Sequence, residues 1–370
     1  TGTFRHIKKE HRFNESRVEH INDGYDLILT YSMSYKKNMS PKRFIAHRDY
    51  AKKLIKEFSN LEKPNVIFIS MPPLSTISEV TKWGKKNNVP VVVDIIDPWP
   101  DSFIKDVPSF LKPLAKIFIS PFYSKLQNSF KDTAAITAIS NGYLNWAKEH
   151  HDKAKLTQAF FLAIDVDEVK KETEKIKKLP AGERPIRLIY SGSLASSYDI
   201  PSMLKAAEII NEKYPGKSEF VFTGKGSQSE MIEKYEKRLD NIEYLGWLSK
   251  EELLHQYGLA DIGLIQHKNS LTQTITYKFF NYMSAGLVLL NSLQTEMAEM
   301  IDQFDLGLNN KEEDYIKLVE NIETYIQNPE FLEKQKSKVV DFTYQKGHTK
   351  NVYGKLVDFL TKIANQDHKY

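Results

Sequence analysis

Short apolar runs alternate with amphipathic segments along the first part of the chain. Residues 65–70 and 89–96 are continuous apolar runs bounded by proline or polar residues, which is typical of parallel strands buried on both faces. Residues 134–139 and 158–164 have the same character, and residues 78–86 are expected to form a helix between the first two strands. This alternation predicts an open parallel sheet with covering helices.

A second series of the same kind begins at Ile186, after a proline-containing linker at residues 179–185. The expected strands are residues 187–190, 220–223, 242–245, 262–265 and 287–290, and the expected helices are residues 201–213 and 229–239. Two successive series predict an α/β protein made of two doubly wound, Rossmann-like domains.

Residues 272–291 form the most informative stretch, with a loop, a short helix that ends at Gly286, and a strand. Lys278 lies at the start of this helix and follows Thr272, Thr274 and Thr276. Backbone N–H groups and the helix dipole favour an anion at such a position, and a diphosphate is the obvious candidate. An ordinary αβ unit with a surface lysine is the alternative.

Glycine turns follow two other predicted strands of the second series. Gly192 and Gly224 come directly after strands and precede helices, and Lys225 adjoins the second turn. Parallel sheets bind ligands at the carboxyl ends of their strands, so these turns and Lys278 favour a nucleotide-diphosphate site. Neither a G-x-x-x-x-G-K-[ST] nor a G-x-G-x-x-G motif is present.

Composition narrows the class of protein. The 370 residues include no cysteine, which excludes disulfides, thiolate nucleophiles and cysteine-bound zinc and fits a reducing cytoplasm. No apolar run reaches the roughly 18 residues that a membrane span needs. The formal net charge of +4 is too small to imply nucleic-acid binding.

Basic residues nevertheless gather in the first part. Residues 36–56 predict a basic helix with an apolar stripe, and residues 110–125 have the same character. Such segments can lie on an anionic membrane surface. The alternative is a solvated helix face whose apolar stripe packs on the domain core.

Several segments together resemble family-4 retaining glycosyltransferases of the GT-B fold. In the second series they are residues 190–194 (YSGSL), 222–226 (FTGKG), 241–247 (NIEYLGW), 259–265 (LADIGLI) and 278–286 (KFFNYMSAG). Residues 70–74 (SMPPL) and 93–102 (VDIIDPWPDS) extend the likeness to the first series. The latter is similar to a segment of bacterial capsule and O-antigen glycosyltransferases, including the L-fucosamine transferase type.

The resemblance implies roles for particular residues. Lys278 would hold the diphosphate leaving group, helped by Thr272, Thr274 and Thr276. The other donor-binding residues would be Gly192, Ser193, Gly224, Lys225, Gly226, Gly246 and Trp247, and the acceptor-side residues would be Pro72, Pro73, Asp97, Trp99 and Asp101. From the residues alone, Trp99 could equally be a core aromatic, and the two aspartates could be helix caps.

Two positions depart from the family pattern. Gln273 and Asn281 stand where many members have glutamates. Amides still hydrogen-bond a ribose or a sugar hydroxyl, but they hold no negative charge against a developing oxocarbenium ion. We expect Gln273 and Asn281 to act as working substitutes beside Lys278 and Asp97 in the catalytic site.

The resemblance also implies a domain layout. Residues 1–170 would form the acceptor-side domain, which lacks its first βαβ segment, and residues 171–345 the nucleotide-sugar domain. Residues 346–370 would form a helix that crosses back to the first domain. Asp165 and Asp167 form a D-x-D triplet, but its place before a charged helix favours N-terminal capping over a metal site. No metal and no cofactor is expected.

The sequence therefore predicts a retaining, metal-independent glycosyltransferase. Its substrates would be a UDP- or GDP-linked sugar and a lipid-linked glycan in bacterial surface polysaccharide biosynthesis. It would be cytoplasmic or peripheral at the inner face of the membrane. Two alternatives stay open: a GT-B nucleotide-sugar epimerase or hydrolase that uses Asp97, Asp101 or Glu296 as acid or base, and a non-catalytic GT-B subunit that binds a partner glycosyltransferase.

Overall fold

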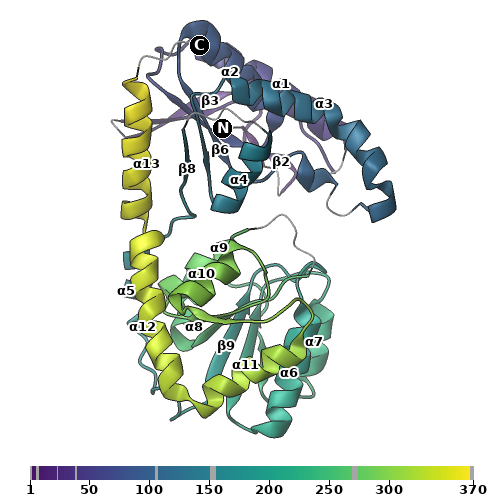
Figure 1. Cartoon of the computed structure of the whole chain (residues 1–370), viewed down its shortest axis with the longest axis vertical. Coiled ribbons are helices and arrows are strands. Elements are labelled where there is room, and N and C mark those ends of the chain that lie inside the picture. Colours follow the sequence, from purple (N-terminus) through teal and green to yellow (C-terminus); the bar gives the residue numbers. More distant parts are fainter. Residues whose placement is uncertain are drawn as a thin grey trace. The chain divides into compact units, whose positions relative to one another are not determined.

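The computed structural model divides the chain into two compact units (Figure 1). Unit 1 comprises Thr1–Ala159 and Val357–Tyr370, and unit 2 comprises Phe160–Leu356. The structure describes residues 2–5, 8–22, 24–37, 40–104, 107–150, 156–268 and 274–366.

Unit 1 is built around a four-stranded parallel sheet with its strands in sequence order. The strands are β5 (Ile67–Met71), β6 (Val91–Ile95), β7 (Ala135–Ala138) and β8 (Thr157–Ala159), and the helices are α1 (Pro41–Phe58), α2 (Leu74–Asn87), α3 (Lys112–Lys131) and α4 (Asn141–His150). Two antiparallel pairs precede them, β1 (Phe4–Arg5) with β2 (Glu10–His11), and β3 (Arg17–Asn22) with β4 (Tyr25–Leu29). The predicted strands are confirmed, although the last one ends at Ala159 rather than at residue 164.

Unit 2 contains a six-stranded parallel sheet with the order β11-β10-β9-β12-β13-β14. Its strands are β9 (Ile186–Ser191), β10 (Ser218–Thr223), β11 (Ile242–Tyr244), β12 (Ile262–Ile265), β13 (Val288–Asn291) and β14 (Gly307–Asn309). This is the strand order of dinucleotide-binding folds, in which the direction of winding reverses between the first and fourth strands. The reversal lies between β9 and β12 here.

The helices of unit 2 cover both faces of its sheet. They are α5 (Val166–Thr173), α6 (Ile200–Lys213), α7 (Ser229–Glu236), α8 (Lys250–Leu259), α9 (Tyr277–Ser284), α10 (Glu296–Phe304), α11 (Tyr315–Gln327) and α12 (Pro329–Lys346), and α13 (Thr349–Ala364) follows. The division between the units falls inside α13.

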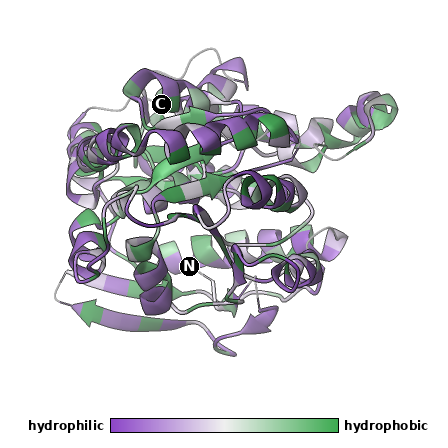
Figure 2. Cartoon of the chain, turned by 90° about the horizontal axis from the view of Figure 1, so that it is seen from below, coloured by the Kyte–Doolittle hydropathy of each residue, from purple (hydrophilic) through white to green (hydrophobic). Residues whose placement is uncertain are grey.

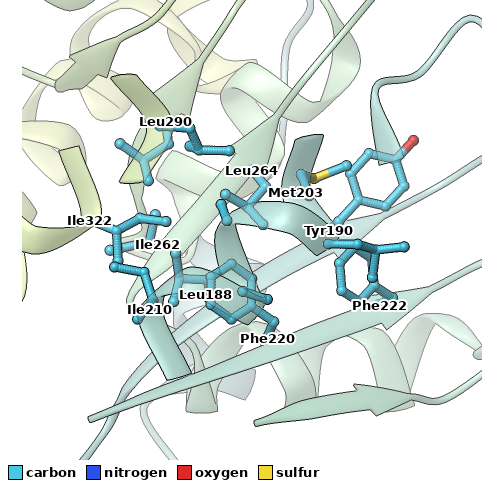
Figure 3. Packing of buried hydrophobic residues seen from close by; sticks show 14 of the residues in the cluster. Leu188, Tyr190, Met203, Ile210, Phe220, Phe222, Ile262, Leu264, Leu290 and Ile322 are labelled. Carbon is cyan, nitrogen blue, oxygen red and sulfur yellow. The ribbon is translucent and has the colours of Figure 1, made fainter. Parts of the chain in front are cut away.

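Neighbouring residues of each central strand face opposite sides of the sheet, as the period of two requires. Leu188 and Tyr190 join a cluster with α6 and α11, whereas Ile189 joins a second cluster with α9 and α10. Figure 3 shows the first cluster and labels Tyr190 at its edge, with the hydroxyl directed away from the apolar side chains. Both faces are therefore apolar, and the strands read as continuous apolar runs.

The boundary between the domains lies at 159/160, and the expected boundary at residue 170 is corrected. Phe161, Leu162 and Ile164 pack against the core of unit 2, and the Ile164 amide donates to the Gly347 carbonyl at 2.8 Å. Apolar side chains thus fix this segment to unit 2 before the first charged helix begins.

The two basic segments of unit 1 differ in what their apolar residues contact. In α1, Phe44, Leu54, Ile55 and Phe58 pack against the core, and the lysines lie outside. The end of α3 that extends away from the rest of unit 1 instead carries both hydrophilic residues and exposed hydrophobic residues (Figure 2). Among the described residues, no helix is both long enough and apolar enough to cross a bilayer.

Candidate donor site in unit 2

A cavity of about 530 Å³ lies at the carboxyl ends of the strands in unit 2. Its walls come from the turns after β9, β10 and β11 and from the start of α9, next to the point where the winding reverses. The lining residues are Ser191, Gly192, Ser193, Tyr198, Thr223, Gly224, Lys225, Trp247, Leu248, Leu253, Tyr257, Tyr277, Lys278 and Asn281. Ligands of open α/β sheets bind at this place.

The amine of Lys278 is the central charged group of this cavity. Its Nζ lies 4.6 Å from the ring centre of Tyr190 and 4.2 Å from that of Tyr198, and it donates to the Tyr190 hydroxyl at 3.4 Å. Ring faces attract a cation but do not neutralise it. Burial lowers the pKa of Lys278 to about 7, and no carboxylate of the described residues forms an ion pair with it. The site is therefore prepared for an anion.

Two glycines with positive φ shape the backbone turns at this amine. Gly192 has φ 134°, and a Cβ there would lie 3.1 Å from Cε and 3.2 Å from Nζ of Lys278. Gly224 has φ 130°, and a Cβ there would overlap the Gly192 carbonyl. L side chains rarely adopt this backbone conformation, so glycine is required at both positions. Glycine at 192 lets the Lys278 side chain lie against the backbone, and glycine at 224 lets the turn after β10 pack on the turn after β9.

Buried tyrosines hold the end of β9 in place. The Ser191 amide donates to the Tyr282 hydroxyl at 2.9 Å, and the Ser191 hydroxyl lies 2.7 Å from that of Tyr257. These contacts tie β9 to α8 and α9. Sequence reasoning missed Tyr198, Tyr257 and Tyr282, because nothing in their local sequence distinguishes them from core aromatics.

Aromatic side chains line another part of the cavity. Trp247 and Tyr277 are 69% and 66% exposed. The Gly246 carbonyl accepts from the Gly224 amide at 2.6 Å and from the Thr223 hydroxyl at 2.7 Å, so Gly246 supports the turn but does not itself line the cavity. An exposed ring at this position offers a stacking surface for a planar base.

Some expected donor-site residues lie elsewhere. Gly226 packs closely on the Leu194 backbone, Thr276 is the buried N-cap of α9, and the Thr274 carbonyl accepts from Thr295. None of these three lines the cavity. Thr272 and Gln273 lie outside the described residues.

The charge balance of the cavity is positive. Lys225 and Lys278 line it, Asn281 contributes a neutral amide, and its lining among the described residues includes no aspartate or glutamate. Glu296, the acid or base of one alternative, begins α10 and is not part of the lining. Such a cavity can bind a diphosphate and hydrogen-bond hydroxyl groups, but its own described lining offers no carboxylate as a base.

The acceptor-side residues lie in unit 1. Trp99 is buried in the core, donates through Nε1 to Asp97 at 2.9 Å, and carries the Arg43 guanidinium 4.9 Å from its ring centre. Asp97 also accepts from Ser102. Trp99 is thus a core aromatic, and Asp97 bonds to side chains instead of capping a helix.

Asp101 is enclosed by three donors. Burial alone would raise its pKa, but bonds from His150, Tyr123 and Trp146 outweigh that effect and hold the pKa below its ordinary value. Asp101 is therefore held ionised in the core edge of unit 1, and helix capping does not account for it.

A smaller cavity of about 240 Å³ occurs in unit 1. Pro73 contributes to the lining of this cavity. Pro72, between the end of β5 and Pro73, does not line it. The remaining lining is Gly2, Phe4, Ser32, Met33, Tyr35, Ala46, His47 and Tyr50.

The D-x-D triplet lies at the start of α5. Asp165 accepts from the Glu168 amide at 3.1 Å, which confirms the expected N-cap. Ligand atoms of Asp165, Asp167 and His348 lie within 4.8 Å of one another. Hydrogen bonds from Lys350 and then His348 lower the pKa of Asp167 to about 2. Lys350 and His348 therefore already bond to this carboxylate.

Comparisons with known proteins agree with this geometry. Residues 171–339, which lie within unit 2, match the family model described as "Glycosyl transferases group 1". A search of curated proteins finds no match. Solved structures give many matches with low sequence identity, so they establish the fold alone.

Three of those structures show the extent of the likeness. Sucrose-phosphate synthase from Thermosynechococcus elongatus matches with a TM-score of 0.69 and 10% identity, over 94% of this chain and 85% of that one. HepE from Anabaena in complex with UDP matches with a TM-score of 0.64 and 11% identity, over 90% of this chain and 86% of that one. WaaG, a glycosyltransferase involved in lipopolysaccharide biosynthesis, matches with a TM-score of 0.57 and 13% identity, over 90% of this chain and 87% of that one.

The protein has the GT-B fold, an α/β architecture of two Rossmann-like units. The family match in unit 2 and this fold together support a GT-B glycosyltransferase.

Proposed function

We propose that the protein transfers a sugar from a nucleoside diphosphate sugar, bound in the cavity of unit 2, to a glycan acceptor. One observation carries the proposal: the amine of Lys278 is buried at the carboxyl ends of β9 and β10 without a carboxylate partner among the described residues, and Gly192 has no side chain to crowd it. A diphosphate supplies the missing negative charge.

The chemistry follows from where charge develops. When the bond between the anomeric carbon and the diphosphate oxygen breaks, the electron pair goes to that oxygen. Lys278 lies where it stabilises this charge, and the amides at the start of α9 add to the effect. An acceptor hydroxyl then bonds to the anomeric carbon, and its proton goes to the diphosphate oxygen that has just left. Attack on the face that the leaving group vacates retains the anomeric configuration.

Asn281 has a separate role in this proposal. It lines the cavity from α9, one helical turn after Lys278. Its neutral amide leaves the diphosphate charge unopposed and can bond a ribose or sugar hydroxyl. We assign the same task to Gln273. Asn281→Ala then lowers turnover in a folded protein, whereas Asn281→Glu is tolerated.

The donor base is uridine or guanosine in this proposal. Trp247 and Tyr277 provide the exposed rings beside the cavity, and HepE, which shares the fold, has been solved with UDP and with UDP-glucose. The acceptor is a lipid-linked glycan of bacterial surface polysaccharide biosynthesis. The resemblance of residues 93–102 and the shared fold with WaaG support that acceptor class.

Nucleoside diphosphate release from UDP- and GDP-sugars tests the proposal. We expect release that depends on a glycan acceptor and that Lys278→Ala abolishes, while the matched surface variant Lys205→Ala keeps it. Lys205 pairs with Glu208 on α6, away from the cavity lining. Equal release without acceptor would indicate a hydrolase, a changed sugar without release would indicate an epimerase, and nucleotide binding without turnover would indicate a non-catalytic subunit.

A further inference from the structure

Helix α3 has two halves with different surroundings. In its C-terminal half, Leu126 and Phe130 are buried in the core of unit 1. In its N-terminal half and the turn before it, Phe110 is 81% exposed, Leu114 53%, Ile117 69% and Phe118 72%. We refer to these four residues as the α3 stripe.

The α3 stripe is a continuous apolar surface. Leu114, Ile117 and Phe118 are spaced by three and one, so they lie on one side of the helix, and Phe110 stands in the turn directly before it. Single exposed apolar residues need no explanation, but four large ones together on one exposed segment mark an interaction site. The stripe of α1, in contrast, is packed in the core.

The charged residues in the segment that carries the stripe have one sign. Residues 107–131 contain Lys112, Lys116, Lys125 and Lys131 and no aspartate or glutamate. Lys112 and Lys116 lie on the opposite side of the helix from Leu114, which gives this half an apolar side and a basic side. Lys125 lies near Arg48 of α1 and Glu79 and Lys82 of α2; burial and then Arg48 lower its pKa, and Glu79 opposes them. Basic residues of α1, α2 and α3 thus outnumber acids around Lys125.

We propose that the α3 stripe inserts into the surface of an anionic lipid bilayer, with the basic residues of α3 and α1 at the level of the headgroups. An exposed helix with an apolar side, a basic side and no acids is the form that such surfaces bind. The proposal rests on the proposed function in one respect, because a membrane-borne acceptor gives the docking its purpose. Docking itself can be measured without any reaction.

Apolar insertion makes a distinct prediction about salt. Attraction between the basic residues and anionic headgroups weakens as salt is added, because it is screened within about 10 Å at 0.1 M. Burial of apolar side chains is not screened in this way. The protein should therefore bind anionic vesicles at low salt, and part of the binding should survive 0.5 M salt.

Co-sedimentation of the full chain with phosphatidylglycerol–phosphatidylethanolamine vesicles tests the proposal. The variant Phe110→Ser, Ile117→Ser, Phe118→Ser should lower the partition coefficient more than about tenfold, because three large apolar side chains are lost. The matched control Ile21→Ser, Ile316→Ser, Val357→Ser removes residues of 52%, 61% and 59% exposure elsewhere and should bind as the wild type.

Three results would overturn the proposal. They are wild-type protein that does not bind the vesicles, a stripe variant that binds equally well, and self-association in sedimentation velocity that the stripe variant abolishes while vesicles remain unbound. Calorimetry with UDP and GDP on the same variants separates the two claims. Wild-type protein that binds the nucleotides but does not dock on vesicles refutes this inference alone, and wild-type protein that docks but binds neither nucleotide refutes the donor site alone.

Discussion

At the scale of single residues, Lys278 determines the chemistry of the cavity. Two tyrosine rings surround its amine, and burial lowers its pKa to about 7. Burial without a carboxylate partner among the described residues disfavours the charged amine, so Lys278 lowers the stability of the folded protein. Its placement makes sense if an anion binds, because the anion favours the protonated form.

Protonation of Lys278 makes stability depend on pH. The pKa is about 7 in the folded chain and about 10.4 in an unfolded one, so the unfolded state binds more protons between these values. The free energy of unfolding therefore rises with pH in that window. Lys278→Met should lack this rise and be about 1–2 kcal/mol more stable at pH 6.5, measured by urea denaturation. If the free energy of unfolding changed with pH in the same way for wild type and Lys278→Met, the amine of Lys278 would not be buried with a lowered pKa.

Gly224 provides a second prediction at this scale. A methyl group there meets the Gly192 carbonyl at a positive φ, whereas Gly216 has φ 70° and open space around it. Gly216→Ala should cost about 1–2 kcal/mol of unfolding free energy from backbone strain alone. Gly224→Ala should cost about 1–3 kcal/mol more, because overlap adds to strain. Equal losses of stability for Gly216→Ala and Gly224→Ala in thermal unfolding would show that the turn at Gly224 does not approach the turn at Gly192.

At the scale of elements, hydroxyl groups connect α9 to β9. Tyr282→Phe removes the acceptor of the buried Ser191 amide and should cost about 1–3 kcal/mol of unfolding free energy. Tyr257→Phe should cost less, because the Ser191 hydroxyl can still bond to Tyr282, 3.2 Å away. Urea denaturation of both variants compares them. A larger loss for Tyr257→Phe would contradict this arrangement.

The sequence predicted the elements with strong patterns and missed those defined by tertiary contacts. The buried strands of both sheets are long apolar runs, so their positions were predictable. β14 has three residues, and its Gly307 is needed only because the Leu289 backbone lies against it. The 3.6-residue period revealed the stripes of α1 and α3. It could not show that one is packed and the other exposed, because that depends on the rest of unit 1.

The candidate site divides in the same way. Gly192, Gly224, Lys225 and Lys278 were predictable, because they follow strands whose carboxyl ends meet at one edge of a sheet. Tyr198 and Tyr257 reach the cavity from separate segments of the chain, and only the fold brings them together. The carboxylates of unit 1 were noticed in the sequence, but their donors, such as Tyr123 and Trp146, come from α3 and α4 and could not be inferred.

At the scale of the whole molecule, we predict that turnover needs no divalent cation. The cavity lining in the described residues has two lysines in place of the carboxylates that hold such ions. Excess EDTA should leave turnover of the donor sugar unchanged. Asp167→Asn, which alters the carboxylate bound by Lys350, should also leave it unchanged. Loss of turnover in both experiments would assign a metal to the D-x-D triplet.

The central claim is that unit 2 binds a nucleoside diphosphate through Lys278. Isothermal titration calorimetry of UDP and GDP at pH 6.5 tests it most directly, with wild type, Lys278→Ala and the control Lys205→Ala. We predict that one nucleotide binds, that Lys205→Ala changes nothing, and that Lys278→Ala weakens binding by about 1.5–3 kcal/mol, the range for a hydrogen bond to a charged group. Equal affinity in wild type and Lys278→Ala, or no binding of either nucleotide, would contradict the account.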